Sequence, residues 1–145
     1  MFLIDTNVIS ELRKARSGKT DPNVLAWAEA VDANQLFLSA ISVMELEMGV
    51  LQIERRDQAQ GELLRDWFEN QVLPEFEDRI IPVDTAVARD CARLHIPNPR
   101  SERDALIAAS AIVHRMRLVT RNTTDFEVED LEVLNPWLVE KITDR

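Results

Sequence analysis

The stretch Phe2-Leu3-Ile4-Asp5-Thr6-Asn7 decides the fold, because a short apolar run ends directly in a carboxylate. In an open parallel α/β sheet, ligands bind outside the carboxyl ends of the strands. If residues 2–5 form a strand, Asp5 therefore points to the edge of the sheet where function is concentrated. The sequence thus predicts both a strand and a candidate site residue at the same position.

The rest of the chain alternates short apolar runs with longer stretches of helical periodicity. This alternation is typical of βαβ units and a parallel sheet, so we predict an α/β fold. At 145 residues, a single domain spanning residues 1–145 is expected. The predicted strands are Phe2–Asp5, Leu36–Ser39, Arg79–Val83, Arg117–Thr120 and Leu131–Leu134. The predicted helices are Val8–Lys14, Pro22–Val31, Ser42–Ile53, Gln58–Leu73, Thr85–Leu94 and Glu102–Met116.

The residue counts exclude several classes of enzyme. With three glycines, the chain has neither a dinucleotide-binding GxGxxG nor a P-loop motif. With two histidines and one cysteine, it has no HExxH motif, no disulfide framework and no site built from several cysteines. No apolar run approaches the roughly 20 residues that a membrane span needs, and no secretory signal precedes the first strand. A cytoplasmic protein whose chemistry depends on carboxylates is expected.

The net charge of −9 argues at first sight against a surface that binds nucleic acid, because affinity for phosphates comes mainly from lysine and arginine. Solubility is the simplest explanation of such an imbalance. An acidic protein can still bind RNA locally, through bound cations or through a basic partner.

Four acids lie within or beside apolar sequence, and each also has a structural explanation. Asp5 could cap the helix that follows it, and Glu45 could be an exposed acid favoured by the dipole of a helix start. Asp104 fits a capping box that begins at Ser101. Asp125 could be an ordinary turn residue. Taken singly, none of the four is decisive.

Their joint placement favours a common site. Asp5 ends the first strand, Glu45 begins the helix after the second strand, and Asp125 follows the fourth. Asp104 begins the helix that leads into the fourth strand, and topology alone does not place it. Carboxylates that lie close together raise one another's pKa and require a cation to ionise together. Mg²⁺ or Mn²⁺ suits such a group of oxygen ligands and can activate water for phosphodiester hydrolysis.

Three segments stand out along the chain in order: FLIDTNVISELRK (residues 2–14), SAISVMELEMGV (39–50) and RDALIAASAIVHRMRLVTRNTTDF (103–126). Together they resemble PIN-domain ribonucleases, and more closely the VapC-type toxins of bacterial toxin–antitoxin systems, with similarity to the FitB-like branch. The resemblance implies a three-layer α/β/α sandwich around a central, mostly parallel five-stranded sheet.

The same resemblance implies a set of functional residues and partners. It implies a metal-binding and catalytic quartet that uses Mg²⁺ or Mn²⁺ to cleave RNA, and three polar residues that orient the carboxylates or face the substrate. It also implies a homodimer and a cognate antitoxin that places a basic residue in the acidic pocket. The quartet is Asp5, Glu45, Asp104 and Asp125, and the three polar residues are Thr6, Thr120 and Asn122.

Arg115 departs from the family pattern, which commonly has glycine between the alanine-rich helix and the next strand, so the turn there is expected to close differently. Two groups of basic residues could hold RNA phosphates, although solvated surface charge is the simpler explanation. These groups are Arg13, Lys14, Arg16 and Lys19 after the first helix, and Arg100 and Arg103 beside Asp104.

Two other functions are compatible with a small α/β protein that carries acids at strand ends. A signalling receiver domain would need a pair of adjacent acids early in the chain and a lysine at the end of its last strand. Here Asp5 stands alone in the first strand, and the late Lys141 lies in the tail. A PIN-like module that binds RNA or an antitoxin without cleaving is the other alternative, against which the presence of all four acids argues.

Overall fold

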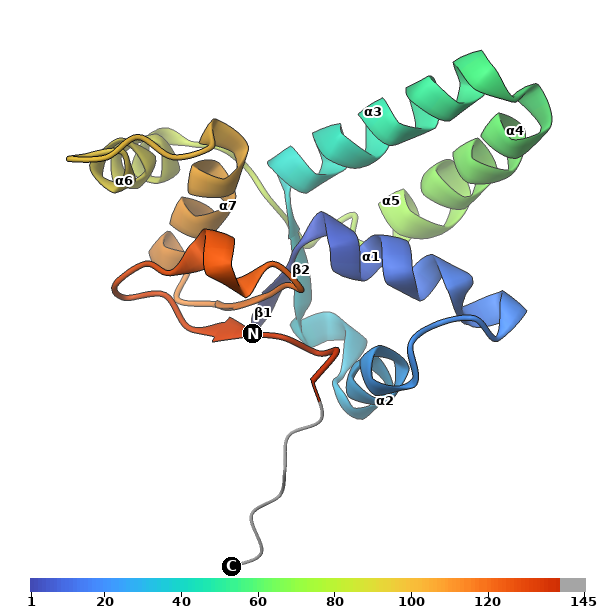
Figure 1. The fold of residues 1–145 in the computed structure, drawn as a ribbon, viewed down its shortest axis with the longest axis horizontal. Helices are drawn as coiled ribbons and strands as arrows, with labels where there is room; N and C mark the ends of the chain where they lie inside the picture. Colours follow the sequence, from blue (N-terminus) through green and yellow to red (C-terminus); the bar gives the residue numbers. More distant parts are fainter. Residues whose placement is uncertain (139–145) are drawn as a thin grey trace, which may run out of the picture.

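The computed structural model describes residues 1–138, which form one parallel sheet with helices on both faces (Figure 1). The strands lie in the order β3-β2-β1-β4-β5, and all four neighbouring pairs are parallel. They are β1 (Phe2–Ile4), β2 (Leu36–Ser39), β3 (Ile80–Ile81), β4 (Arg117–Val119) and β5 (Val133–Leu134). Because β1 is the central strand, Asp5 stands at the middle of the carboxyl edge of the sheet.

The strand order excludes the receiver-domain alternative. Receiver domains have the flavodoxin-like order 2-1-3-4-5, in which the third strand lies between the first and the fourth. Here β1 pairs directly with β4, and β3 lies at the sheet edge beyond β2.

The helices are longer at several ends than periodicity predicted. The helix expected from Val8 begins at Thr6, and the one expected over Ser42–Ile53 extends over Ala40–Arg56. The helices are α1 (Thr6–Leu12), α2 (Pro22–Ala30), α3 (Ala40–Arg56), α4 (Gln58–Trp67), α5 (Leu73–Glu75), α6 (Thr85–Leu94) and α7 (Glu102–Val113). Short helical turns are η1 (Arg13–Ser17), η2 (Ala33–Gln35), the π-helical η3 (Phe68–Val72) and η4 (Thr123–Phe126).

The strands are shorter than predicted at their ends. The strand expected over Arg79–Val83 pairs only over β3, and Pro82 follows directly. Proline has no backbone N–H to continue a ladder, which gives a physical reason for that end.

Alternating residues of the central strands divide the core into two layers, which confirms the α/β/α sandwich. Ile4 packs in a cluster with side chains of α1, α3 and η3, whereas its neighbour Leu3 packs against α7. On that second face α6 lies outside α7, and Val87 and Ala109 meet between them. No helix among residues 1–138 is both long enough and apolar enough to cross a bilayer.

Helices α3 and α4 form an antiparallel pair that projects from the sheet (Figure 1). Arg65 of α4 joins them, because its guanidinium contacts Glu47 at 2.6 Å and Glu54 at 2.9 Å. At the closest approach of the two helices, a Cβ on Gly61 would lie 2.6 Å from Glu54 Cα. Further along, Phe68 is buried in the core beneath this pair.

Arg115 closes the turn between α7 and β4 in the left-handed conformation, with φ of 54°. The Met116 N–H donates to Ala111 O at 2.9 Å, a contact typical of a helix that ends in a left-handed residue. The turn thus adopts the backbone conformation that glycine favours, and the expectation of a different closure is wrong. The arginine carries the strain that a glycine would avoid.

Replacing Arg115 with glycine is therefore expected to stabilise the protein. A non-glycine residue in the left-handed region costs about 1–2 kcal/mol, part of which glycine loses again to the entropy of the unfolded chain. We expect a gain of about 1 kcal/mol, or a melting temperature higher by about 3 °C, in thermal denaturation. Gly18→Ala, at φ of 71°, should shift the melting temperature in the opposite direction. An unchanged melting temperature for Arg115→Gly would show that the turn is unstrained.

Candidate active site

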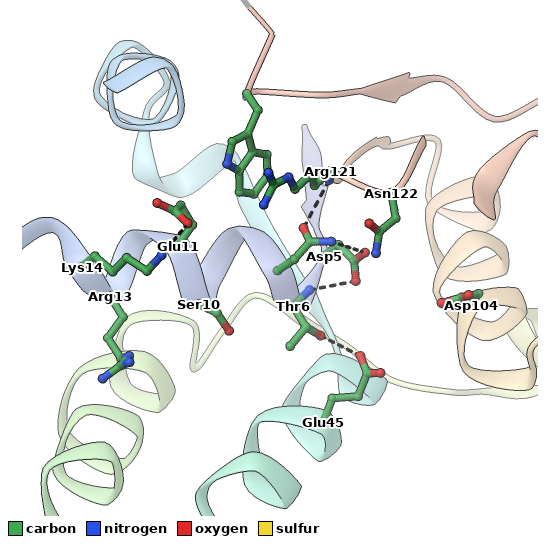
Figure 2. A pocket seen from close by; sticks show the side chains of 12 residues that line it. Asp5, Thr6, Ser10, Glu11, Arg13, Lys14, Glu45, Asp104, Arg121 and Asn122 are labelled. Carbon is green, nitrogen blue, oxygen red and sulfur yellow. Dashed lines mark hydrogen bonds and ion pairs between the residues drawn. The ribbon is translucent and has the colours of Figure 1, made fainter. Parts of the chain in front are cut away.

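A cavity of about 490 Å³ lies at the carboxyl edge of the sheet, beyond the end of β1. Figure 2 shows Asp5 from this strand end, Glu45 from α3 and Asp104 from α7 around the cavity. The structure therefore brings together three of the four predicted acids, although they lie far apart in the sequence.

Asp5 is 7% exposed and holds the centre of a hydrogen-bond network. Its Oδ1 accepts from the Thr6 backbone N–H at 2.8 Å, and its Oδ2 accepts from the Thr120 hydroxyl at 2.8 Å. Asp5 is also the N-cap of α1. Both interpretations of this residue hold at once, because one carboxylate caps the helix and lines the cavity.

Thr6 and Thr120 lie where they can orient the carboxylates. The Thr6 hydroxyl donates to Glu45 Oε1 at 2.7 Å, so this side chain links the ends of β1 and α3. The buried Thr120 Oγ1 accepts from the Asn122 backbone N–H at 3.1 Å while it donates to Asp5. The side chain of Asn122 lines the cavity (Figure 2).

Asn7 is a member of the network that the sequence did not single out. Its Nδ2 donates to Thr120 Oγ1 at 3.2 Å and lies 3.4 Å from Asp5 Oδ2, and its Oδ1 accepts from the Arg121 N–H at 3.3 Å. The available signal was its place two residues after Asp5, in the first turn of a helix that starts at a strand end.

Asp104 reaches the cavity because α7 runs across the full sheet. The helix must end beside the start of β4, which it feeds, so it begins at the opposite, carboxyl edge. Ile107 and Ala111 of the same helix then pack on the sheet. The Ser101 side chain accepts no hydrogen bond from the backbone N–H groups of the first turn of α7, among the described residues. The capping-box interpretation is thus not supported.

Asp125 lies in η4 and is exposed, and it is not among the residues that line the cavity. Its charge nevertheless raises the pKa of Asp104. Asp125 therefore stands beside the three acids and not among them.

The predicted basic residues differ in where they lie relative to the cavity. Arg13 and Lys14 line the cavity, whereas the described cavity wall does not include Arg16 or Lys19. Arg103 approaches Glu45 Oε2 at 3.5 Å. Arg100 instead binds the Leu94 carbonyl through its Nε at 3.1 Å.

Carboxylates gather in the cavity, and the cations that line it in the described part of the chain are exposed ones. Burial raises the pKa of Asp5, and the Thr120 and Thr6 hydrogen bonds only partly oppose this. The charges of Glu45 and Asp104 raise it further. Burial likewise raises the pKa of Asp104, followed by the charges of Asp125 and Glu45, against smaller opposing effects of Ser101 and Arg103.

The donor set fits a hard divalent cation. Oxygen ligands with excess negative charge are those that Mg²⁺ and Mn²⁺ prefer, and Mg²⁺ usually keeps several waters in place of a closed protein cage. Within residues 1–138 no three acidic, histidine or cysteine side chains lie close enough together to hold a metal ion by themselves. The open arrangement of the acids around the cavity is consistent with a partly hydrated ion.

The raised pKa values predict a pH-dependent response to metal. A carboxyl group whose pKa is raised by folding adds stability below its ordinary value of 3.8 and loses that contribution as the pH rises through the folded value. Metal competes with protons for the same oxygens. We therefore expect Mg²⁺ to raise the melting temperature more at pH 8 than at pH 5, relative to EDTA. An equal shift at both pH values would contradict this linkage.

Comparison with known proteins identifies the family. Residues 2–129 match the PIN domain. The chain is 39% identical over 145 residues to the VapC ribonuclease Y4jK of Sinorhizobium fredii, covering 94% of this chain and 98% of that protein. It is 35% identical to toxin FitB of Neisseria gonorrhoeae, covering 94% and 99%. The crystal structure of FitAcB from Neisseria gonorrhoeae matches with a TM-score of 0.85 and 33% identity, over 96% of this chain and 100% of that chain.

The chain therefore belongs to the PIN-domain family. Within that family it is a toxin of the VapC and FitB type, which confirms the resemblance seen in the three sequence segments.

Proposed function

We propose that this chain is the toxin of a toxin–antitoxin pair and hydrolyses RNA phosphodiesters with the help of Mg²⁺ or Mn²⁺. The observation that carries the proposal is the buried Asp5 carboxylate, which shares one cavity with Glu45 and Asp104 and has no buried cation beside it among residues 1–138. The ribonuclease relative that shares 39% of its residues supports the reaction class.

The four acids have distinct roles in this proposal. Asp5, Glu45 and Asp104 are direct or water-mediated metal ligands, and Asp125 adds negative charge beside Asp104. The bound ion supplies an activated water and neutralises charge at the phosphoryl group. Fixed carboxylate geometry matters because misplaced ligands weaken both metal binding and activity.

Polar side chains hold that geometry. Thr6 fixes Glu45, and Thr120 fixes Asp5, each through a hydroxyl that donates at 2.7–2.8 Å. Asn122 faces the cavity from the same loop that supports Thr120. We assign these three residues to positioning of the carboxylates and of the substrate.

We further propose a cognate antitoxin as the partner of the acidic cavity. Solved structures of relatives describe FitAcB and a FitAB assembly bound to DNA. The excess of carboxylates would accept a basic side chain from an antitoxin, which would then compete with metal and RNA. Cytoplasmic RNA and a cytoplasmic antitoxin make the cytoplasm the expected location.

A homodimer is the third part of the proposal. Met44, Met48 and Leu51 of α3 are 40%, 36% and 51% exposed, and their spacing of four and three residues places them on one helix face. Exposed apolar side chains grouped in this way are typical of a protein interface. Sedimentation of the wild type and of Met48→Glu would test whether this face joins two copies.

The activity is tested directly with purified protein and labelled single-stranded RNA. Cleavage should appear with Mg²⁺ or Mn²⁺ and disappear with EDTA, and growth arrest on expression should be relieved by the antitoxin. Tight RNA binding without cleavage under any divalent metal would instead favour the non-catalytic PIN-like module.

A further inference from the structure

Two arginines beside the acids have no carboxylate partner within residues 1–138. In a chain with a net charge of −9, Arg13, Lys14 and Arg121 nevertheless line the cavity. Lys14 is paired with Glu11 at 3.0 Å. Arg13 and Arg121 instead lie over tryptophan rings, with Arg121 5.2 Å from the ring centre of Trp137. Their positive charges thus remain available to an anionic ligand.

Arg121 is fixed at both ends. Its backbone N–H donates to the Asn7 side chain, which also donates to Thr120 and lies against Asp5. Its guanidinium lies over Trp137. The position of this arginine is therefore coupled to the carboxylate network through its backbone and is held by an aromatic ring at its tip.

Trp137 is itself held in place. Its backbone N–H donates to Asn135 Oδ1 at 2.9 Å, and its carbonyl accepts from Asn23 Nδ2 of α2 at 2.8 Å. These bonds tie the segment that carries the indole to an element on the opposite side of the cavity from α7. Arg121 and Trp137 both belong to the cavity wall, and Figure 2 shows Arg121 and the acids facing the same space.

Resting on the proposed function, we propose that Arg121 binds a phosphate adjoining the scissile one in single-stranded RNA, and that Trp137 is its positioning residue. A guanidinium stacked on a ring keeps the N–H groups of its edge free for bidentate contacts to phosphate oxygens. Basic side chains combined with aromatic rings are typical of grooves that bind single strands. A preorganised cation would hold the strand so that the next phosphate lies at the acids.

The test compares Arg121→Gln with Arg89→Gln, an exposed arginine of α6 outside the cavity wall that also lacks an ion pair among the described residues. Arg121→Gln should raise the KM for RNA by about tenfold or more with a smaller change in kcat, as expected for the loss of one charge-assisted contact. The slope of log affinity against log salt should fall by about 0.7, the value of one phosphate contact to a single strand. Arg89→Gln should change neither quantity.

Variants of Trp137 distinguish a role in positioning Arg121 from a purely structural role. Trp137→Leu should raise the KM in the same direction as Arg121→Gln, and Trp137→Phe, which keeps an aromatic face, should restore most of the affinity. Equal KM values and salt slopes for the Arg121 and Arg89 variants would overturn the proposal. So would an Arg121 variant that loses only antitoxin binding.

The phosphate-binding role of Arg121 can fail or hold independently of the nuclease activity. If none of the divalent metals supports RNA cleavage by the wild type, the nuclease assignment fails. Binding of fluorescent single-stranded RNA, measured by anisotropy in EDTA, then still decides whether Arg121→Gln weakens affinity and reduces the salt slope relative to Arg89→Gln. Equal binding by both variants would overturn the phosphate-binding role.

Discussion

Asp5→Asn is expected to abolish RNA cleavage, by at least about a thousandfold in kcat/KM, while the protein stays folded. Asparagine keeps the size of the side chain and can still accept the Thr6 backbone N–H that Asp5 Oδ1 binds. It removes the negative charge of the carboxylate that we propose as the central metal ligand. The measurement is cleavage of labelled RNA at saturating Mg²⁺ and Mn²⁺, together with circular dichroism of the purified variant.

The same substitution should not destabilise the metal-free protein. Burial and the charges of Glu45 and Asp104 raise the pKa of Asp5, so folding destabilises its ionised form relative to its neutral form. Neutral asparagine removes that penalty, and the melting temperature in EDTA is expected to stay equal or rise. The rise produced by Mg²⁺ should shrink.

Asp84→Asn is the matched control, because Asp84 also caps a helix, accepting the Val87 N–H at 3.0 Å, but lies outside the cavity wall. Asparagine is as good an N-cap as aspartate. If both variants retain cleavage, the role of Asp5 is only that of a cap. Loss of cleavage in the Asp5 variant alone supports the metal-ligand role.

Gly61→Ala is expected to destabilise the protein although alanine is the better helix former. A Cβ at this position would meet the Glu54 backbone at 2.6 Å, so α3 and α4 must move apart. Overpacking costs about 1–3 kcal/mol, which exceeds the roughly 1 kcal/mol that alanine gains over glycine in a helix. Movement of α4 would also disturb the contacts of Arg65 with Glu47 and Glu54. Chemical denaturation should show a net loss of about 1–2 kcal/mol.

Gly49→Ala, in the same pair of helices, is expected to stabilise the protein. A Cβ on Gly49 would meet no atom within 4 Å, so only the gain in helix propensity of about 1 kcal/mol remains. The two substitutions are chemically identical and should change stability in opposite directions. Similar changes in stability for both variants would show that close packing at Gly61 does not limit which side chains the α3–α4 pair tolerates.

The sequence could predict the fold because its signals are local. Apolar runs and helical periodicity located all five strands and the first residue of four helices, and the resemblance supplied the layers. The end of β3 was harder to place, because pairing beyond Ile81 depends on a neighbouring strand and on Pro82. The helix predicted over Gln58–Leu73 is divided into α4, the π-helical η3 and the start of α5, and no local pattern in the sequence indicates this division.

The candidate site was only partly predictable. Asp5, Glu45 and Asp104 could be chosen because acids in apolar sequence are unusual, but the position of Asp104 required the course of α7 across the sheet. Trp137 carries no local signal of function, and the only one for Asn7 is its place two residues after Asp5. Their roles arise from contacts to Thr120 and Asn23, which lie more than a hundred residues away in the chain.

The pairing of β1 with β4 determines where the chain can be divided into two fragments. The loop between α6 and α7 separates a segment with the first three strands, Asp5 and Glu45 from a segment with the last two strands and Asp104. A chain cut in that loop would leave neither fragment with the three acids of the cavity. Pairing of β1 with β4 between the two fragments would bring the three acids together again. Activity would then depend on reassembly of the fragments.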